Sequence, residues 1–146
     1  MQALLAHAKR LGVTVHAAHL PKPWRGFYDA DKRMVVYHIE LTPVERRSVL
    51  AHELGHAFYD HRCSGDSGQE HAADLYAARL LIDPAEYARL EAMEYSSPWS
   101  IADELQLEVE LVELFQRHAL AKIHGATYAW PRLGSRQHAG RWSVTE

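Results

Sequence analysis

The stretch TPVERRSVLAHELGH, residues 42–56, decides the fold, because it predicts both a helix and the group that the helix carries. A threonine followed by a proline and then by Glu45 is typical of a capped helix start, in which the Thr42 hydroxyl and the Glu45 carboxylate satisfy free backbone amides. We expect this helix to run to about Tyr59. Its central residues, 52–56, read H-E-x-x-H, so a functional site is predicted on this helix.

The two histidines of the motif are spaced to bind one metal ion. Residues four apart lie one turn apart on the same helix face, with Cβ atoms about 5–6 Å from each other. The imidazoles of His52 and His56 can therefore both reach one Zn²⁺ at ~2.0–2.1 Å. Glu53 leans over the same face and could take a proton from a metal-bound water without being a ligand. Gly55 costs about 1 kcal/mol relative to alanine inside a helix, and a close approach of another backbone would explain it.

A third ligand candidate lies on a second predicted helix, residues 69–82, which an Asp-Pro pair would end. On a helical wheel, Glu70 and Asp74 share a face with small and apolar residues, which we interpret as the inward face. Buried carboxylates are costly unless they are paired or bound to a metal. We therefore expect Glu70 to be a ligand and Asp74 to accept the second N–H of a ligand histidine. The alternative is a solvated helix start, where acidic residues suit the helix dipole.

Other residues near the motif are weaker candidates. His61 is one residue short of the position that a three-histidine zinc motif requires, and His71 points about 100° away from Glu70 around the helix. We interpret both histidines as loop or surface residues that could contact the substrate. Cys63 could supply a thiolate as a fourth ligand, although a lone loop cysteine is usually inert. Candidate donors to the oxyanion formed during hydrolysis are Tyr59, Tyr76, Tyr95, His61 and His71.

The remaining pattern predicts an α+β domain. Strand-like segments come early in the chain and helical segments come late, which favours α+β over a parallel α/β arrangement. We predict one domain over residues 1–124 and an irregular tail over residues 125–146. The other predicted elements are a helix at residues 1–11, strands at 13–20, 26–28 and 34–39, and a helical pair at 98–106 and 108–123.

Composition limits the classes of function. The chain has 146 residues and a net charge of −3, which provides no general electrostatic reason for direct nucleic-acid binding. No apolar run approaches the ~20 residues that a membrane span needs. The N-terminal segment has basic residues after its apolar ones rather than before them, unlike a signal peptide. We therefore expect a cytoplasmic protein. A single cysteine excludes an internal disulfide framework.

These motifs resemble the ImmA/IrrE family of metallopeptidases. The resemblance rests on SVLAHELGH, residues 48–56, and on the pattern E-x-x-A-D-x-x-A-A-x-L-L at residues 70–81. The family pattern has Phe where this chain has Tyr76, and Met-Pro where it has residues 82–84, Ile-Asp-Pro. The likeness covers roughly residues 1–120 and not the tail. It implies a small zincin-like fold, in which an N-terminal helix and a short three-stranded sheet precede a bundle of helices carrying the motif and the downstream glutamate.

The resemblance also implies a function. Members of this family are zinc endopeptidases in which two histidines and one glutamate hold the metal. Carried over to this chain, one Zn²⁺ would bind His52, His56 and Glu70, with Glu53 as the general base and Asp74 hydrogen-bonded behind a ligand. Many members cleave a helix-turn-helix transcriptional repressor in phages, mobile elements or stress responses. A protein substrate of this kind is therefore the expected partner. Zinc itself is inferred from the ligand types.

Two alternatives stay open. The protein could be a non-catalytic, zinc-containing binding module, of the antirepressor or toxin–antitoxin type. Its closed site would need a fourth ligand from Cys63, His61 or His71. Residues 98–123 also have the outline of a DNA-binding helix-turn-helix. The acidic residues at the start of its second helix argue against DNA binding, and we interpret this pair as core-forming helices; these acids are Glu108, Glu110 and Glu113.

Overall fold

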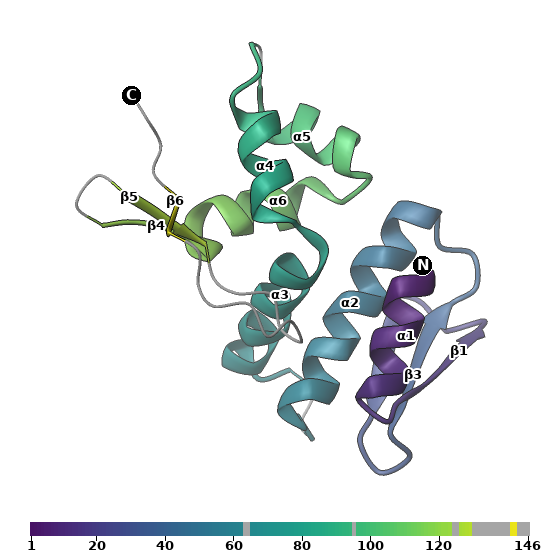
Figure 1. Cartoon of the computed structure of the whole chain (residues 1–146). Helices are drawn as coiled ribbons and strands as arrows, with labels where there is room; N and C mark the ends of the chain where they lie inside the picture. Colours follow the sequence, from purple (N-terminus) through teal and green to yellow (C-terminus); the bar gives the residue numbers. More distant parts are fainter. Residues whose placement is uncertain (63–64, 95, 124–125, 130–140, 143–146) are drawn as a thin grey trace. The chain divides into compact units, whose positions relative to one another are not determined.

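The computed structural model describes residues 1–62, 65–94, 96–123, 126–129 and 141–142. The chain divides into two compact units, Met1–Ala77 and Ala78–Glu146, and each unit is considered by itself. The predicted α+β class is confirmed, with an N-terminal helix and a small three-stranded sheet followed by helices (Figure 1). Among the described residues, no helix combines the length and the apolar character that crossing a bilayer requires.

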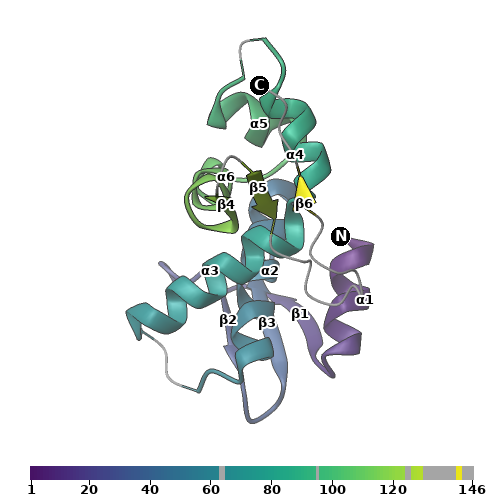
Figure 2. The same ribbon diagram turned by 60° about the vertical axis from the view of Figure 1, so that its left-hand side comes forward.

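The first unit consists of a small mixed sheet with helices packed against it. Strand β1 pairs in parallel with β3, and β2 pairs with β3 in antiparallel fashion, so the strand order is β1-β3-β2 (Figure 2). Helix α1 contacts β1 and α2, while α2 contacts β2 and β3. Strand β2 therefore lies at the edge of the sheet and packs against α2. The elements are α1 Gln2–Arg10, β1 Thr14–Ala18, β2 Gly26–Asp29, β3 Met34–His38, α2 Pro43–Tyr59 and α3 Ser67–Leu81.

The core of this unit follows the apolar face of each element. Val35 on the central strand and Leu50 and Leu54 on α2 have no exposed surface, because the sheet and the helix bury one another. Gly26 permits this close packing, since a Cβ at that position would lie 2.6 Å from Cγ1 of Val49. Burial of such side chains is the main favourable term in folding. The sheet and α2 therefore form the support on which the histidine motif is held.

Helix α2 begins and ends with local signals in its sequence. The Thr42 hydroxyl accepts a hydrogen bond from the Glu45 backbone amide, and the Glu45 carboxylate accepts one from the Thr42 backbone amide, at 2.9 Å, as the capping box predicted. At the other end, Asp60 adopts the left-handed conformation with φ of 52°. Left-handed residues terminate helices and turn the chain back, which here redirects it at His61.

The second unit is helical, with a small sheet near the end of the chain. The helix predicted at 98–106 is confirmed as α5, where the Ser97 hydroxyl accepts a hydrogen bond from the Ser100 amide and Pro98 is the first residue. Within the unit, the buried rings of Tyr87 and Phe115 lie 5.0 Å apart, centre to centre. The elements are α4 Pro84–Glu91, α5 Pro98–Leu105, α6 Val109–Leu114, the π-helical turn η1 Phe115–Ala119, β4 Leu120–Ile123, β5 Ala126–Ala129 and β6 Arg141–Trp142.

The structure of this unit differs from the sequence predictions at three places. Helix α4 was not predicted, because Asp83-Pro84 was interpreted only as the end of the preceding helix; Asp83 also caps the new one, accepting from the Ala85 amide at 3.0 Å. The prediction of a single helix over 108–123 is wrong, because helix α6 ends at Leu114 and is followed by the π-helical turn η1 and strand β4.

The tail was expected to be irregular, and this is wrong where β5 and β6 lie. Strand β4 pairs with β5 so that Ile123 lies opposite Ala126. A two-residue spacer ending in glycine between β-prone segments is a hairpin signal, but the residues before it, 108–123, were predicted to form one helix. Gly125 itself lies outside the described residues.

Candidate metal centre

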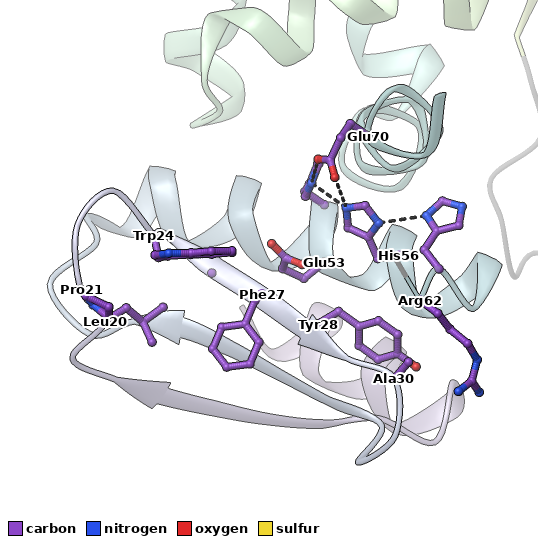
Figure 3. Close-up of a pocket in the computed structure, with 13 residues that line it drawn as sticks. Leu20, Pro21, Trp24, Phe27, Tyr28, Ala30, Glu53, His56, Arg62 and Glu70 are labelled. Atoms are coloured by element: carbon purple, nitrogen blue, oxygen red, sulfur yellow. Dashed lines mark hydrogen bonds and ion pairs between the residues drawn. The ribbon is translucent and has the colours of Figure 1, made fainter. Parts of the chain in front are cut away.

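Three side chains from two helices of the first unit converge on one point, as the sequence predicted. His52 and His56 come from α2, and Glu70 comes from the first turns of α3. The two Nε2 atoms are 3.0 Å apart, and the Glu70 carboxylate oxygens lie 3.2 Å from His52 Nε2 and 3.5 Å from His56 Nε2. Figure 3 shows Glu70 and His56 facing each other across this point. The ligating atoms of all three residues lie within 4.8 Å of one another.

These separations fit a metal ion. Ligand atoms at ~2.0–2.1 Å from a tetrahedral zinc ion lie about 3.3 Å from each other, which is close to the observed 3.0, 3.2 and 3.5 Å. Two imidazoles and one carboxylate are also a donor set that suits Zn²⁺ and other borderline divalent ions. The cluster is therefore compatible with a metal site that takes three protein ligands.

Asp74 lies directly behind one of these histidines. Its Oδ1 accepts a hydrogen bond from Nδ1 of His52 at 2.8 Å, so that in the neutral ring Nε2 of His52 carries no proton and is directed at the cluster. The predicted pairing of Asp74 with a ligand-type histidine is thus present in the geometry. The buried face predicted for Glu70 and Asp74 is wrong, because their side chains are 41% and 47% exposed.

Glu53 is the buried acid of the motif, with 8% of its surface exposed. Burial is the main cause that raises the pKa of its carboxyl to about 7. The positive charge of His52 acts in the opposite direction, the charge of Glu70 adds to the increase, and a hydrogen bond from the Tyr28 backbone lowers it. A carboxyl group with a pKa near neutrality can both accept and release a proton.

The two histidines differ in their electrostatic surroundings. Burial lowers the pKa of His52, but its hydrogen bond to the Asp74 carboxylate and the charges of the nearby carboxylates outweigh burial and raise the pKa above its ordinary value. For His56, burial and the neighbouring His52 lower the pKa. A neutral imidazole is the form that binds metal. The lowered pKa of His56 therefore favours its neutral form, while His52 is oriented by its carboxylate partner.

Gly55 explains how α3 comes close enough to contribute Glu70. A Cβ at this position would lie 2.8 Å from Cα and 2.9 Å from the carbonyl oxygen of Ala73. Such distances are shorter than real Cβ contacts, so any side chain would force the two backbones apart. The close approach expected from a helix-interior glycine is confirmed, and it occurs one turn after Glu70.

The cluster opens into a cleft of about 520 Å³ on the first unit. One part of its wall is apolar and consists of Leu20, Pro21, Trp24 and Phe27, from β2 and the segment before it. In Figure 3, Trp24 lies on one side of Glu53, and Arg62 lies on the opposite side, toward the other end of the cleft. This wall was not predicted from the sequence, because alternation in a short strand indicates which side chains share a face but not which other segments pack beside that face.

Only some of the weaker candidates for the site lie near the cleft. His61 lines the cleft, and its Nδ1 lies 2.9 Å from Nδ1 of His56. Tyr59 stacks on His61, with ring centres 5.3 Å apart.

Two other candidates, Tyr76 and His71, do not line the cleft. Tyr76 is fully buried in the core, where its hydroxyl contacts Nε2 of His7 at 2.5 Å. His71 is exposed. Cys63 and Tyr95 lie outside the described residues.

A helical H-E-x-x-H motif whose histidines converge with a downstream glutamate defines the type of site found in metallopeptidases. The model of the M78 peptidase family, described as the IrrE N-terminal-like domain, matches residues 8–115. The chain therefore belongs to this peptidase family, and the resemblance noted from its motifs is confirmed. A comparison with curated proteins finds no match.

Proposed function

We propose that this protein is a zinc-dependent endopeptidase that cleaves a protein partner. The observation that carries the proposal is the convergence of His52, His56 and Glu70 within 4.8 Å, beside a buried glutamate on the same helix. Membership of a peptidase family supports the reaction class. Zinc is the metal that two imidazoles and one carboxylate most often hold in hydrolytic sites with an open position.

Each residue of the site has a proposed role. A zinc ion held by His52, His56 and Glu70 would supply an acidified water and polarise the scissile carbonyl. Glu53 accepts the proton of the attacking water at its carboxylate and then donates it to the leaving amine nitrogen. Asp74 keeps the proton of His52 on Nδ1, so that Nε2 remains a ligand. The low exposure of Glu53 limits competing contacts with solvent.

The edge of the sheet supports a peptide as the substrate. The His38 amide donates to the Arg25 carbonyl at 2.8 Å, and hydrogen bonding alternates along an antiparallel pair. The backbone groups of Phe27 therefore face β3, while those of Gly26 and Tyr28 face the outer edge of β2. Extended peptides bind by adding a strand to such an edge. A peptide placed there would pass beside Glu53, which the Tyr28 backbone already contacts.

The apolar wall supports a preference in that peptide. Trp24 is 51% exposed and stands in the cleft wall with Leu20 and Phe27. A large apolar side chain next to the scissile bond would cover this surface and remove apolar area from water. We propose as the natural substrate a helix-turn-helix transcriptional repressor, cleaved in phage, mobile-element or stress regulation, as the family resemblance suggests. The protein is not proposed to contact nucleic acid itself.

The direct test compares the wild type with Glu53→Gln. Both proteins are loaded with zinc, their metal content is measured, and cleavage of a mixed peptide library is followed by mass spectrometry. We expect one zinc per chain in both, and cleavage by the wild type only, since the amide cannot take the proton of water. If Glu53→Gln cleaves at the wild-type rate, the proposed mechanism is wrong. Zinc in both proteins with no cleavage of any peptide or repressor would favour a non-catalytic binding module.

A further inference from the structure

His61 returns to the metal cluster just after α2 ends. The left-handed conformation of Asp60, with φ of 52°, reverses the chain, and the His61 amide donates to the His56 carbonyl at 3.0 Å. The ring of His61 then lies against that of His56, with centres 5.1 Å apart and planes inclined by 68°. This geometry brings the two Nδ1 atoms to 2.9 Å, within hydrogen-bonding distance.

The position of protons on this pair follows from the cluster. Two ring nitrogens that share a hydrogen bond hold one proton between them, so one donates and the other accepts. Nε2 of His56 faces Nε2 of His52 and the Glu70 carboxylate, where a ligand must present a lone pair. The proton of neutral His56 is then on Nδ1, and Nδ1 of His61 is the acceptor. His61 carries its own proton on Nε2.

We propose that His61 is a positioning residue for the metal: it accepts the Nδ1–H of His56 and so holds that imidazole in the metal-binding tautomer and rotation. This inference rests on the proposed metal site. It gives His56 the same kind of support that Asp74 gives His52. The Nδ1 atom of each histidine is thus hydrogen-bonded to a residue of a different element. For His52 this element is α3, and for His56 it is the turn after α2.

A second contact holds the ring of His61 in place. Tyr59 stacks on it, with planes inclined by only 18° and centres 5.3 Å apart. Stacking restricts the rotation of the imidazole and therefore keeps Nδ1 directed at His56. The position of His61, one residue short of that needed by a three-histidine motif, is consistent with this role, because the ring reaches a ligand rather than the metal.

The test separates the hydrogen bond from ring packing with two substitutions. His61→Phe keeps an aromatic ring to stack on Tyr59 but removes the acceptor. His61→Asn loses the ring but places an amide oxygen near the position of Nδ1. His16→Ala is the matched control, since His16 is an exposed histidine on β1 outside the cluster. Zinc affinity is measured by competition with a chromophoric chelator, and the cobalt-substituted proteins are compared by their visible absorption spectra.

We expect His61→Phe to weaken zinc binding by about 10–100-fold and to alter the cobalt spectrum, because outer partners of ligand histidines have effects of this size. His61→Asn should recover most of the affinity, and His16→Ala should match the wild type. Zinc binding by His61→Phe as tight as that of the wild type would overturn the inference and leave the proposed peptidase intact. If the wild type itself binds no zinc, both the inference and the proposed function are wrong.

Discussion

The Asp74 carboxylate lies 2.8 Å from Nδ1 of His52, on the side of the ring opposite the nitrogen that faces Glu70. This pairing links the second helix of the site to the first through a hydrogen bond as well as through the cluster itself. Since an acceptor at Nδ1 keeps the proton of the neutral ring away from Nε2, it leaves Nε2 of His52 able to bind a metal ion.

Removal of Asp74 should therefore weaken metal binding. We expect Asp74→Ala to lower zinc affinity by about 10–100-fold, and Asp74→Asn to lower it less, because the amide oxygen can still accept the Nδ1–H. Competition with a chelator measures both. Asp103→Ala, at an exposed position on α5, is the control. Equal affinities for Asp74→Ala and the control would mean that the hydrogen bond does not support the metal.

Gly55 should be intolerant of any side chain. Gly55→Ala places a methyl group 2.8 Å from the Ala73 backbone, so the helices must separate and the free energy of unfolding should fall by about 1–3 kcal/mol. Urea denaturation measures this loss. Gly68→Ala is the control, since its Cβ would meet only a side-chain oxygen, of Asp66, at 3.2 Å. If Gly55→Ala is as stable as the wild type, the close approach does not limit packing.

Trp24 should affect substrate binding rather than the chemical step. Once a cleaved peptide with a large apolar side chain has been found, Trp24→Ala should lower kcat/KM for it by about ten-fold, mainly through KM. Peptides with small polar side chains should be little affected. Trp99→Ala is the control, because Trp99 is 70% exposed and does not line the cleft. An equal loss on both classes of peptide would argue against an apolar subsite.

His7 should make stability depend on pH. Burial, and then the charge of Arg10, lowers the pKa of His7 below its ordinary value of 6.5. Below pH 6.5 the unfolded chain therefore binds more protons at this residue than the folded chain, and stability falls as the pH falls. Urea denaturation between pH 7.5 and 5.5 should show a shallower decrease for His7→Gln than for the wild type. An identical decrease in both proteins would show that His7 does not contribute.

Local periodicity explains how much of the site could be predicted. The spacing of His52 and His56, and the one-turn interval between Glu70 and Asp74, determine which side chains share a helix face. The exposure of that face was misjudged, because small and apolar neighbours on a helix also occur where it borders an open cleft. The partner of His56 was missed for a different reason. The contact between His61 and His56 depends on the left-handed conformation of Asp60. Aspartate tolerates this conformation but does not require it, so the turn could not be predicted from the residue type.

The errors in the second unit come from signals with two meanings. Asp83-Pro84 ends one helix and also starts the next, with the same combination of cap and proline that was recognised at Thr42-Pro43. A glycine after an apolar run is typical of both a helix end and a tight hairpin. Only tertiary packing selects between such alternatives, so they could not be resolved from the sequence.

Whether His52, His56 and Glu70 hold one metal ion is tested most directly by the metal content of the purified protein. Wild type and Glu70→Ala are dialysed against excess zinc and then against metal-free buffer, with Glu86→Ala, an exposed glutamate on α4, as the control. We expect one zinc per chain in the wild type and the control, and a large loss in Glu70→Ala. A wild type without zinc, or a Glu70→Ala protein that retains zinc fully, would show that these three residues do not hold the metal together.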